Sequence, residues 1–209
     1  MLSTHISHQI YAKLSFDATF NQKKIIEKLS DWLSQEEHSQ IFLLNGYAGT
    51  GKTTIIAALV GALKELGIKT ILLAPTGRAA KVLARYSHSD ALTIHKRIYR
   101  ERTMTDYESK FSLDYNKERG ALFIVDEASM LSSSSSADDA AFGSGNLLDD
   151  LVQYVRSGKQ CRLMLVGDDA QLPPVGADYS PALDPASLLP YGDVVYATMD
   201  EVVRQQHDS

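Results

Sequence analysis

Apolar residues along the chain fall into short continuous runs, and elsewhere they recur at helical spacing. The runs are four or five residues long and are bounded by turn residues, as in strands that are buried on both faces. They cover residues 41–44, 70–74, 121–125, 163–166 and 194–197. Where apolar positions recur every three or four residues, the pattern is typical of a helix with one buried side. The helices expected on this basis cover residues 19–33, 52–66, 77–85 and 147–155.

Short buried strands that alternate with helices indicate a parallel sheet with helices on both faces. The expected fold class is therefore α/β, doubly wound, with a mainly parallel sheet. Asn146 precedes one helix and is expected to cap it, and Gly67 is expected to end another in the left-handed conformation. Residues 1–18 show no clean periodicity, so we expect a loosely held lead-in before one domain over residues 19–209.

Two polar segments interrupt the alternation of strands and helices. Residues 99–120 carry scattered aromatic side chains, and we expect a small inserted hairpin or subdomain there. Residues 132–145 open with five serines and end in Gly-Ser-Gly, a composition that favours a mobile loop. Neither segment shows the apolar periodicity of a core element.

Composition narrows the class of protein. A chain of 209 residues with 44% hydrophobic residues can build one ordinary core. No apolar run approaches the roughly 18 residues that a membrane span needs, and the amino terminus lacks the pattern of a signal peptide. We therefore expect a cytoplasmic protein without a membrane partner. The single cysteine, Cys161, excludes an internal disulfide and is expected to be a buried strand residue.

The net charge of −5 argues against a protein that coats nucleic acid through overall basicity, but the charge is unevenly distributed. Between residues 78 and 102, seven basic residues stand against two acidic ones. The basic residues of this stretch, called the basic stripe below, are Arg78, Lys81, Arg85, Lys96, Arg97, Arg100 and Arg102. From charge alone, the stripe fits a solvated helix face and a nucleic-acid-binding surface equally well.

Residues 46–53 read Gly-Tyr-Ala-Gly-Thr-Gly-Lys-Thr and stand between a predicted strand and a predicted helix, where a phosphate-binding P-loop belongs. Glycines let successive backbone N–H groups turn toward a β-phosphate, and the helix end adds a positive field. Lys52 would reach the β- and γ-phosphates, and Thr53 would complete the shell of a Mg²⁺ ion. The alternative is a Gly-rich turn with an exposed lysine. The ATP-binding residues predicted from the loop are Gly46, Ala48, Gly49, Thr50, Gly51, Lys52, Thr53 and Thr54.

Two acidic residues follow the buried run 121–125, and a glutamine comes shortly after the run 163–166. We assign Asp126, together with Thr53, to the metal and Glu127 to the attacking water. Gln171 precedes two prolines and is predicted to bond the γ-phosphate or the attacking water. The alternatives are an acidic turn and a strand-exit turn held by the prolines. With Lys52, these residues are the catalytic candidates.

Taken in order along the chain, these segments resemble the motif series of superfamily 1 DNA helicases of the RecD-like and Dda-like kind. The ordered series is more specific than any one motif. Residues 20–22 resemble the Q motif, 46–53 motif I, 74–80 motif Ia, 93–96 motif Ib, 125–130 motif II, 167–175 motif III and 202–205 motif IV. The resemblance implies the first RecA-like P-loop motor domain of such a helicase, with ATP and Mg²⁺ as cofactors.

The resemblance also implies roles for residues outside the P-loop. Gln22 would read the adenine, and Arg204 would approach the γ-phosphate as a further catalytic residue. Single-stranded DNA would bind on motifs Ia and Ib, mainly through phosphate and sugar, and the basic stripe lies over the same stretch. The implied DNA contacts are Pro75, Thr76, Arg78, Thr93 and His95. Read from the residues alone, Thr93 fits a helix cap and His95 a packed core residue equally well.

Two further features of the family, a hairpin and a second motor domain, are not clearly recognisable in this sequence. A duplex-splitting hairpin stands between motifs Ib and II in the family, and residues 99–120 occupy that place without a readable strand pair. A second motor domain completes the ATP site with an arginine. No second set of motifs follows Gln205, so we expect that domain to be absent and the chain to be a fragment of a longer 5′-to-3′ helicase, with weak activity of its own. A stand-alone remnant is the alternative.

Three functions are compatible with these residues. The leading hypothesis is the ATPase motor domain of a helicase, stimulated by DNA. A nucleotide-dependent module that grips single strands or a partner would not need the water-positioning Glu127. A small-molecule kinase on a P-loop scaffold would not need the Gln171 segment or the basic stripe, and it would phosphorylate its metabolite without DNA.

Overall fold

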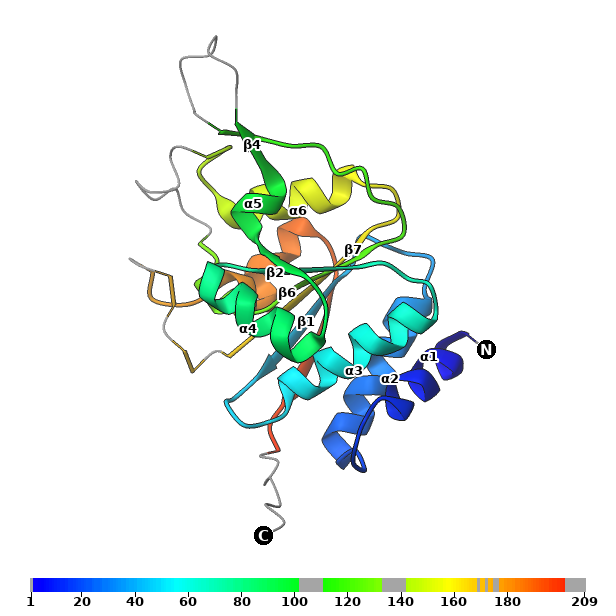
Figure 1. Ribbon diagram of the computed structural model, residues 1–209. Helices are drawn as coiled ribbons and strands as arrows, with labels where there is room; N and C mark the ends of the chain where they lie inside the picture. Colours follow the sequence, from blue (N-terminus) through cyan, green and yellow to red (C-terminus); the bar gives the residue numbers. More distant parts are fainter. Residues whose placement is uncertain are drawn as a thin grey trace.

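The computed structural model describes residues 2–101, 111–132, 142–168, 170–171, 173–174 and 177–201. Within these residues, six strands form a sheet in the order β3-β2-β6-β7-β1-β8, and every neighbouring pair is parallel. Figure 1 labels β2, β6, β7 and β1 near the centre of the molecule. The strands are β1 (Ile41–Gly46), β2 (Thr70–Ala74), β3 (Ala91–Thr93), β6 (Leu122–Val125), β7 (Arg162–Gly167) and β8 (Val194–Met199). The predicted parallel sheet is confirmed.

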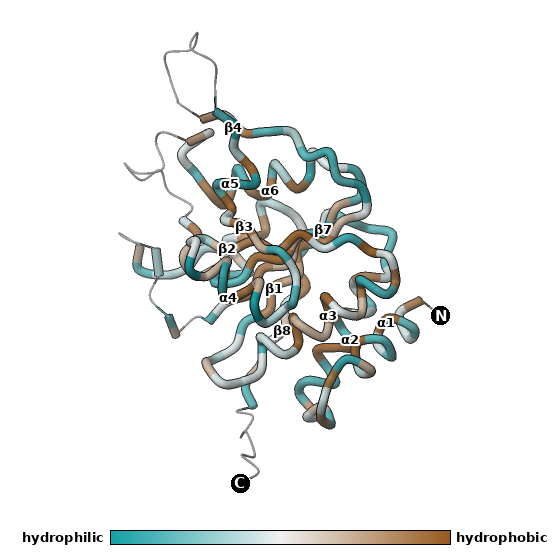
Figure 2. Tube along the Cα trace, viewed as in Figure 1, coloured by the Kyte–Doolittle hydropathy of each residue, from teal (hydrophilic) through white to brown (hydrophobic). Residues whose placement is uncertain are grey.

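The central strands are rich in apolar residues because both of their faces are covered. Every residue of β1, β6 and β7 is buried. Alternate residues point to opposite faces, so Phe42 and Leu44 enter one core cluster while Ile41 and Leu43 enter the other. Figure 2 shows apolar residues concentrated along the strands at the centre of the molecule. None of the helices in the described ranges is long and apolar enough to cross a membrane.

Helices cover both faces of the sheet. One face carries α1 (Leu2–Ala12), α2 (Phe20–Ser34), α3 (Lys52–Glu65) and α4 (Gly77–Ser87). The other face carries α5 (Ile94–Ile98), α6 (Leu147–Ser157), α7 (Pro185–Leu188) and the 3-10 turns η1 (Ala128–Met130) and η3 (Pro181–Leu183). A further 3-10 turn, η4 (Leu189–Tyr191), precedes β8. The predicted doubly wound α/β fold is confirmed.

The ends of the helices follow the signals in the sequence. Asn146 caps α6 by accepting a hydrogen bond from the N–H of Asp149 at 3.0 Å, as predicted. Gly67 follows the end of α3 with a φ of +70°, the left-handed conformation expected there. Thr19 and Gln22 begin α2 with a reciprocal capping box.

Residues 2–12 differ from the loosely held lead-in that the sequence predicts. They form α1, and its Ile6 and Ile10 are buried against the same core cluster as α2 and α3. Two isoleucines one turn apart do not stand out in a polar stretch, but they bury one side of a short helix once a partner surface is present. The prediction was wrong because tertiary packing, rather than a local signal, stabilises this helix.

The polar segment after α5 contains a strand pair. Residues Tyr99–Glu101 form β4 and Phe111–Leu113 form β5, and the two strands pair antiparallel. Strands of three residues are too short to display alternation, so the sequence shows no clear pair there. Residues 102–110, and residues 133–141 of the expected mobile loop, lie outside the described residues. Cys161 is buried, as expected, but it lies immediately before β7 rather than in the strand.

Candidate nucleotide-binding site

The carboxyl ends of the parallel strands meet at one edge of the sheet, and the segments with candidate chemistry leave from that edge. The P-loop, residues 46–53, begins at the end of β1, and Asp126 follows β6. The segments at residues 74–80 and 167–175 begin at the ends of β2 and β7. Because β6 and β7 lie between β2 and β1, the fold brings these segments to neighbouring positions.

The P-loop is shaped by glycines in the left-handed conformation. Gly49 and Gly51 have φ angles of +79° and +91°, which residues with a Cβ rarely adopt. Thr50 donates from its hydroxyl to the carbonyl oxygen of Tyr47 at 2.8 Å and so closes the turn. Gly51 is the N-cap of α3 and has no side chain with which to bond the first N–H groups of the helix. Unpaired N–H groups at the positive end of a helix dipole are the groups that commonly bind anions in proteins.

Gly46 holds the start of the loop against the edge strand β8. A Cβ on Gly46 would lie 2.7 Å from the Cβ of Met199, so a larger residue would push the two segments apart. Asn21, in the first turn of α2, donates to the carbonyl oxygen of Thr198 at 3.1 Å. The amino end of α2 is therefore tied to the same edge of the sheet as the P-loop.

Gln22 lies next to this contact and has an unused donor. Its Oε1 accepts from the N–H of Thr19 at 3.0 Å as part of the capping box. Gln22 is only 1% exposed, and its Nε2 is buried without a hydrogen-bond partner in the described part of the chain. Burial of an unpaired amide N–H is unfavourable, so this donor suits an acceptor supplied by a ligand, such as a ring nitrogen of adenine.

Lys52 is the first residue of α3, and its ammonium group lies over the P-loop. It donates to the carbonyl oxygens of Gly46 and Tyr47, the latter at 2.9 Å. Thr53 is exposed and Thr54 is half-buried in the same turn. Because the hydrogen-bond acceptors of Lys52 are neutral, the loop presents a positive charge where phosphate would bind.

Asp126 is held from two sides. Its Oδ1 accepts from the N–H of Glu127 at 2.9 Å, and its Oδ2 accepts from the hydroxyl of Tyr86 in α4. Burial, and after it the charge of Asp126, raises the pKa of Tyr86, so the phenol stays protonated and remains a donor. No group of three or more His, Cys, Asp or Glu side chains in the described ranges is arranged to hold a metal ion. A metal at Asp126 would therefore take its other ligands from phosphate, hydroxyl and water.

Glu127 has the backbone strain and the environment of a functional residue. Its φ of +56° costs about 1–3 kcal/mol for a residue with a Cβ, and such outliers cluster at functional sites. Burial raises the pKa of Glu127 above its ordinary value, and the charges of Asp126 and Asp168 raise it further. The charge of Lys52 and a hydrogen bond with Gln171 lower the pKa. The structure thus brings together the four predicted catalytic residues that it describes.

Gln171 is held by contacts between the turns that follow β6 and β7. The hydroxyl of Ser129 donates to Oε1 of Gln171 at 3.4 Å, and the N–H of Gln171 donates to the carbonyl oxygen of Asp168 at 3.2 Å. The hydroxyl of Ser180 donates in turn to the carbonyl oxygen of Ser129 at 2.9 Å. These bonds keep the Gln171 side chain on the same side of the sheet edge as Glu127.

The DNA-contact candidates at the end of β2 lie at the surface. Thr76 is the N-cap of α4 and accepts from the N–H of Ala79 at 3.2 Å, and it is exposed. Arg78 is exposed and makes no ion pair with a described residue, while Pro75 is half-buried before the helix. This helix end leaves a cation and backbone N–H groups accessible to phosphate.

The candidates at the end of β3 have structural roles. Thr93 is the N-cap of α5 and accepts from the N–H of Lys96 at 3.2 Å. The ring of His95 packs edge-on against Phe142 with centroids 4.9 Å apart, and it lies 5.6 Å from Tyr99. The structural alternative for Thr93, a helix cap, is confirmed, whereas His95 is a half-buried residue with aromatic contacts and not part of either core cluster. A DNA contact by Thr93 or His95 stays a prediction.

Some residues of the basic stripe form ion pairs and others do not. Arg97 bonds Glu118 at 2.7 Å, and Arg100 lies 3.8 Å from Asp114. Both acidic partners come from outside the stripe in the sequence. The exposed residues of the stripe without an ion pair in the described ranges are Arg78, Lys81, Arg85 and Lys96. The exposed cations of the stripe without an ion pair therefore lie on α4 and at Lys96 in α5.

Two residues with predicted roles lie outside the described part of the chain, and one contact at the site was not predicted from the sequence. Arg204 and Arg102 lie outside the described residues. Tyr86, whose hydroxyl reaches Asp126, belongs to no recognised motif, and no spacing in the sequence points to this contact. Asp168 stands in the segment recognised from the sequence, but its effect on the pKa of Glu127 follows only from the fold.

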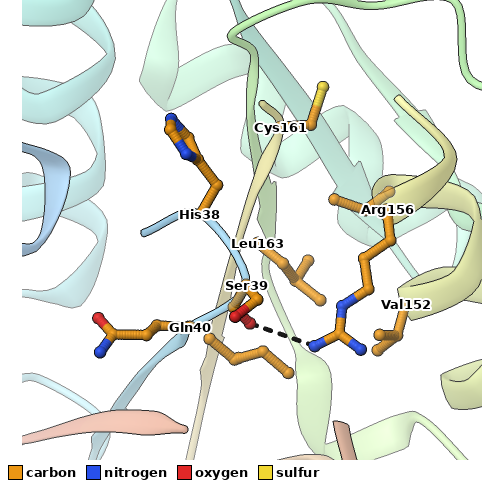
Figure 3. Close-up of a pocket in the computed structure, with 9 residues that line it drawn as sticks. His38, Ser39, Gln40, Val152, Arg156, Cys161 and Leu163 are labelled. Atoms are coloured by element: carbon orange, nitrogen blue, oxygen red, sulfur yellow. Dashed lines mark hydrogen bonds between the residues drawn. The ribbon is translucent and has the colours of Figure 1, made fainter. Parts of the chain in front are cut away.

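A small pocket lies at the opposite, amino-terminal edge of the sheet (Figure 3). Arg156 crosses it and donates to the carbonyl oxygen of Ser39 at 3.2 Å, and the buried Cys161 also lines the pocket. Its cavity volume of about 10 Å³ is close to the minimum for a single water molecule. This pocket is far too small for a nucleotide.

Comparisons with known proteins point to helicases. A family model described as an AAA domain matches residues 21–209. The chain is 32% identical over 156 residues to an ATP-dependent RecD2 DNA helicase from Deinococcus radiodurans, an alignment that covers 75% of this chain and 19% of that protein. It is 35% identical over 121 residues to the ATP-dependent DNA helicase dda of enterobacteria phage T4, covering 54% of this chain and 26% of that protein. The chain thus spans about a fifth to a quarter of the length of these curated relatives.

Solved structures share the fold. A Pif1 helicase from Bacteroides, in complex with ADP-AlF3 and ssDNA, superposes with a TM-score of 0.54 at 19% identity, over 91% of this chain and 44% of that one. A Pif1 helicase from Candida albicans gives a TM-score of 0.54 at 20% identity, over 92% of this chain and 42% of that one. At these identities, the likeness concerns the arrangement of the strands and helices.

Proposed function

The chain belongs to the AAA domain family and is related in sequence to RecD2 and Dda DNA helicases, and on this premise we propose that it is the ATP-hydrolysing first motor domain of a superfamily 1 helicase. The full-length parent would move 5′ to 3′ on single-stranded DNA. The observation that carries the proposal is the convergence of Lys52, Asp126 and Gln171 on Glu127. A P-loop alone binds nucleotide, whereas a carboxylate of raised pKa beside a glutamine also suits activation of water.

The P-loop edge would hold ATP and Mg²⁺. The N–H groups around Gly49 and Gly51 would bond the phosphates, and the unpaired Nε2 of Gln22 would donate to the adenine. Thr53 and Asp126 would hold Mg²⁺, which neutralises phosphate charge when it is bound.

Hydrolysis would be carried out by side chains with separate tasks. Glu127 would accept a proton from the attacking water, for which its raised pKa makes it a better base. Gln171 would orient that water, because Ser129 already holds its amide oxygen near the site. Lys52 would stabilise the negative charge that develops on the transferring phosphoryl group. Arg204 is proposed to add a second positive charge there.

Single-stranded DNA and a second motor domain are the proposed partners. The exposed end of α4, with Thr76 and Arg78, would bind phosphate and sugar, and Pro75, Thr93 and His95 would border the same path. The second domain would close the nucleotide site with an arginine, a contribution of about a thousandfold or more in comparable systems. The first motor domain on its own is therefore expected to hydrolyse ATP weakly.

A nucleotide-dependent binding module with little turnover is the second candidate function. The strained backbone and raised pKa of Glu127 favour the ATPase, because phosphate binding by the P-loop requires neither. A metabolite kinase is less well supported, because it leaves the exposed cations of α4 without a role.

Steady-state ATP hydrolysis with and without a single-stranded oligonucleotide tests the proposal, with Lys52→Ala as the blank. We expect saturable nucleotide binding that depends on Lys52 and weak hydrolysis that the oligonucleotide increases. Binding without hydrolysis above the blank under either condition would favour the binding module. Transfer of phosphate to a metabolite without DNA would instead identify a kinase.

Replacing Arg78 and Lys81 together with alanine is expected to weaken single-strand binding for all base sequences alike. Both side chains are exposed on α4 and make no ion pair with a described residue, so they remain available to phosphate. Loss of two phosphate contacts should reduce the slope of log affinity against log salt by about 1.4. Fluorescence anisotropy of labelled oligonucleotides over a salt series measures both effects.

The matched control replaces Lys64 and Lys117, which are also exposed and without an ion pair in the described ranges, so the change in net charge is the same. A loss of binding confined to one base sequence would indicate base readout. An equal loss in the control would show that overall charge, rather than α4, governs binding.

A further inference from the structure

The hydroxyl of Tyr86 reaches the carboxylate that is proposed to face the metal. Tyr86 lies in the last turn of α4, and its hydroxyl donates to Oδ2 of Asp126, 40 residues further along the chain. Its ring is half-buried and packs against the core cluster between the sheet and helices α1 to α4. The contact is possible because α4 follows β2, which is the neighbour of β6 in the sheet.

The two hydrogen bonds of Asp126 fix its orientation and leave it able to act. Oδ1 is held by the N–H of Glu127 in the turn after β6, and Oδ2 is held by Tyr86 from α4. A carboxylate oxygen can accept two hydrogen bonds, so each oxygen keeps one position for a metal or for a water bound to it. Rotation of the carboxylate would break at least one of the two bonds.

The hydroxyl is the part of Tyr86 that the core does not require. A phenylalanine would fill nearly the same space against the apolar cluster, because the two rings differ only by the oxygen. The same helix begins at Thr76 and Arg78, the exposed candidates for DNA contact. Tyr86 is therefore the point at which α4, with its surface cations, touches the nucleotide site.

We propose that Tyr86 is a positioning residue that holds Asp126 in the orientation needed for Mg²⁺ bound together with a nucleotide. This role rests on the proposed function, because it assigns Asp126 to the metal. Tyr86 touches neither nucleotide nor metal in this scheme. It acts through the carboxylate, as the hydrogen-bond partners of metal ligands commonly do.

The test compares the wild-type chain with Tyr86→Phe by titrating a fluorescent ADP analogue at a series of Mg²⁺ concentrations and in EDTA. Affinity for the analogue in EDTA should be unchanged, because the P-loop and Gln22 are untouched. The Mg²⁺ concentration that produces half of the metal-dependent gain in affinity should rise by about tenfold. A purely structural role would weaken binding in EDTA or lower the unfolding temperature without a separate effect on the metal.

Tyr11→Phe is the matched control. Tyr11 packs against the same core cluster, and its hydroxyl contacts the carbonyl oxygen of Lys23, away from Asp126. We expect this variant to titrate with Mg²⁺ like the wild type. An unchanged or lower Mg²⁺ requirement in Tyr86→Phe would overturn the positioning role, and so would an equal shift in Tyr11→Phe. If wild-type binding of the analogue does not depend on Mg²⁺ at all, the proposed function itself fails.

Discussion

Replacing Lys52 with alanine is expected to lower ATP turnover by about 100- to 1000-fold and to leave the chain folded. The lysine ammonium lies over the P-loop, where its charge would stabilise the phosphoryl group during transfer. Its side chain contributes nothing to either core cluster, so its loss creates no cavity. Phosphate release with oligonucleotide present measures the turnover, and circular dichroism during heating measures the folding.

Lys64→Ala is the control for this prediction, because Lys64 is exposed in the last turn of the same helix. It should hydrolyse ATP like the wild type. Undiminished turnover in Lys52→Ala would remove the P-loop from the proposed mechanism. Loss of cooperative unfolding would show instead that the lysine supports the loop structure through its bonds to Gly46 and Tyr47.

Replacing Glu127 with glutamine is expected to stop hydrolysis while nucleotide binding is retained. Glutamine has nearly the same shape and cannot accept a proton, and general-base catalysis is typically worth about 100- to 10,000-fold. Wild-type turnover should rise with pH through the raised pKa of Glu127 and then level off, whereas the residual turnover of Glu127→Gln should lack this step. Single-turnover hydrolysis across a pH series, together with nucleotide titration, checks both expectations.

The thermal stability of the chain provides an independent test of the raised pKa of Glu127. Because its folded-state pKa is raised, the contribution of this group to stability is fully present below the ordinary pKa and is lost as pH rises through the folded-state value. At neutral pH the ionised carboxylate therefore destabilises the fold, and Glu127→Gln should unfold at a higher temperature than the wild type. Glu36→Gln, at an exposed position after α2, should leave the unfolding temperature unchanged. Equal losses of binding and turnover in Glu127→Gln would contradict its assignment to water.

Much of the fold follows from signals between close neighbours in the chain. The glycine spacing of residues 46–53 places a P-loop between a strand and a helix, and β1 and α3 are found there. Asn146 and Gly67 mark helix ends because a cap or a left-handed residue acts on the adjacent turn only. The apolar runs identify the buried strands because a strand covered on both faces has few places for polar side chains.

Other elements were not predicted, because no pattern among neighbouring residues indicates them. The helix α1 depends on Ile6 and Ile10 finding a surface on α2 and α3, and isolated short helices are marginal in water. The strands β4 and β5 are held by each other, and three residues cannot display a period. For the site, the sequence supplies the candidates, and their roles in catalysis and DNA binding stay predictions until the variants are measured.

The amino-acid sequence is thus sufficient to predict the α/β class, the P-loop and the helix caps. Each of these features shows itself in residues within a turn or two of one another. The order of the strands, β3-β2-β6-β7-β1-β8, belongs to the tertiary structure, because short apolar runs of similar composition do not specify which of them pair. The bonds of Tyr86 to Asp126, of Ser129 to Gln171 and of Arg97 to Glu118 all depend on that order. They join groups that are distant in sequence and meet only when the helices pack onto the assembled sheet.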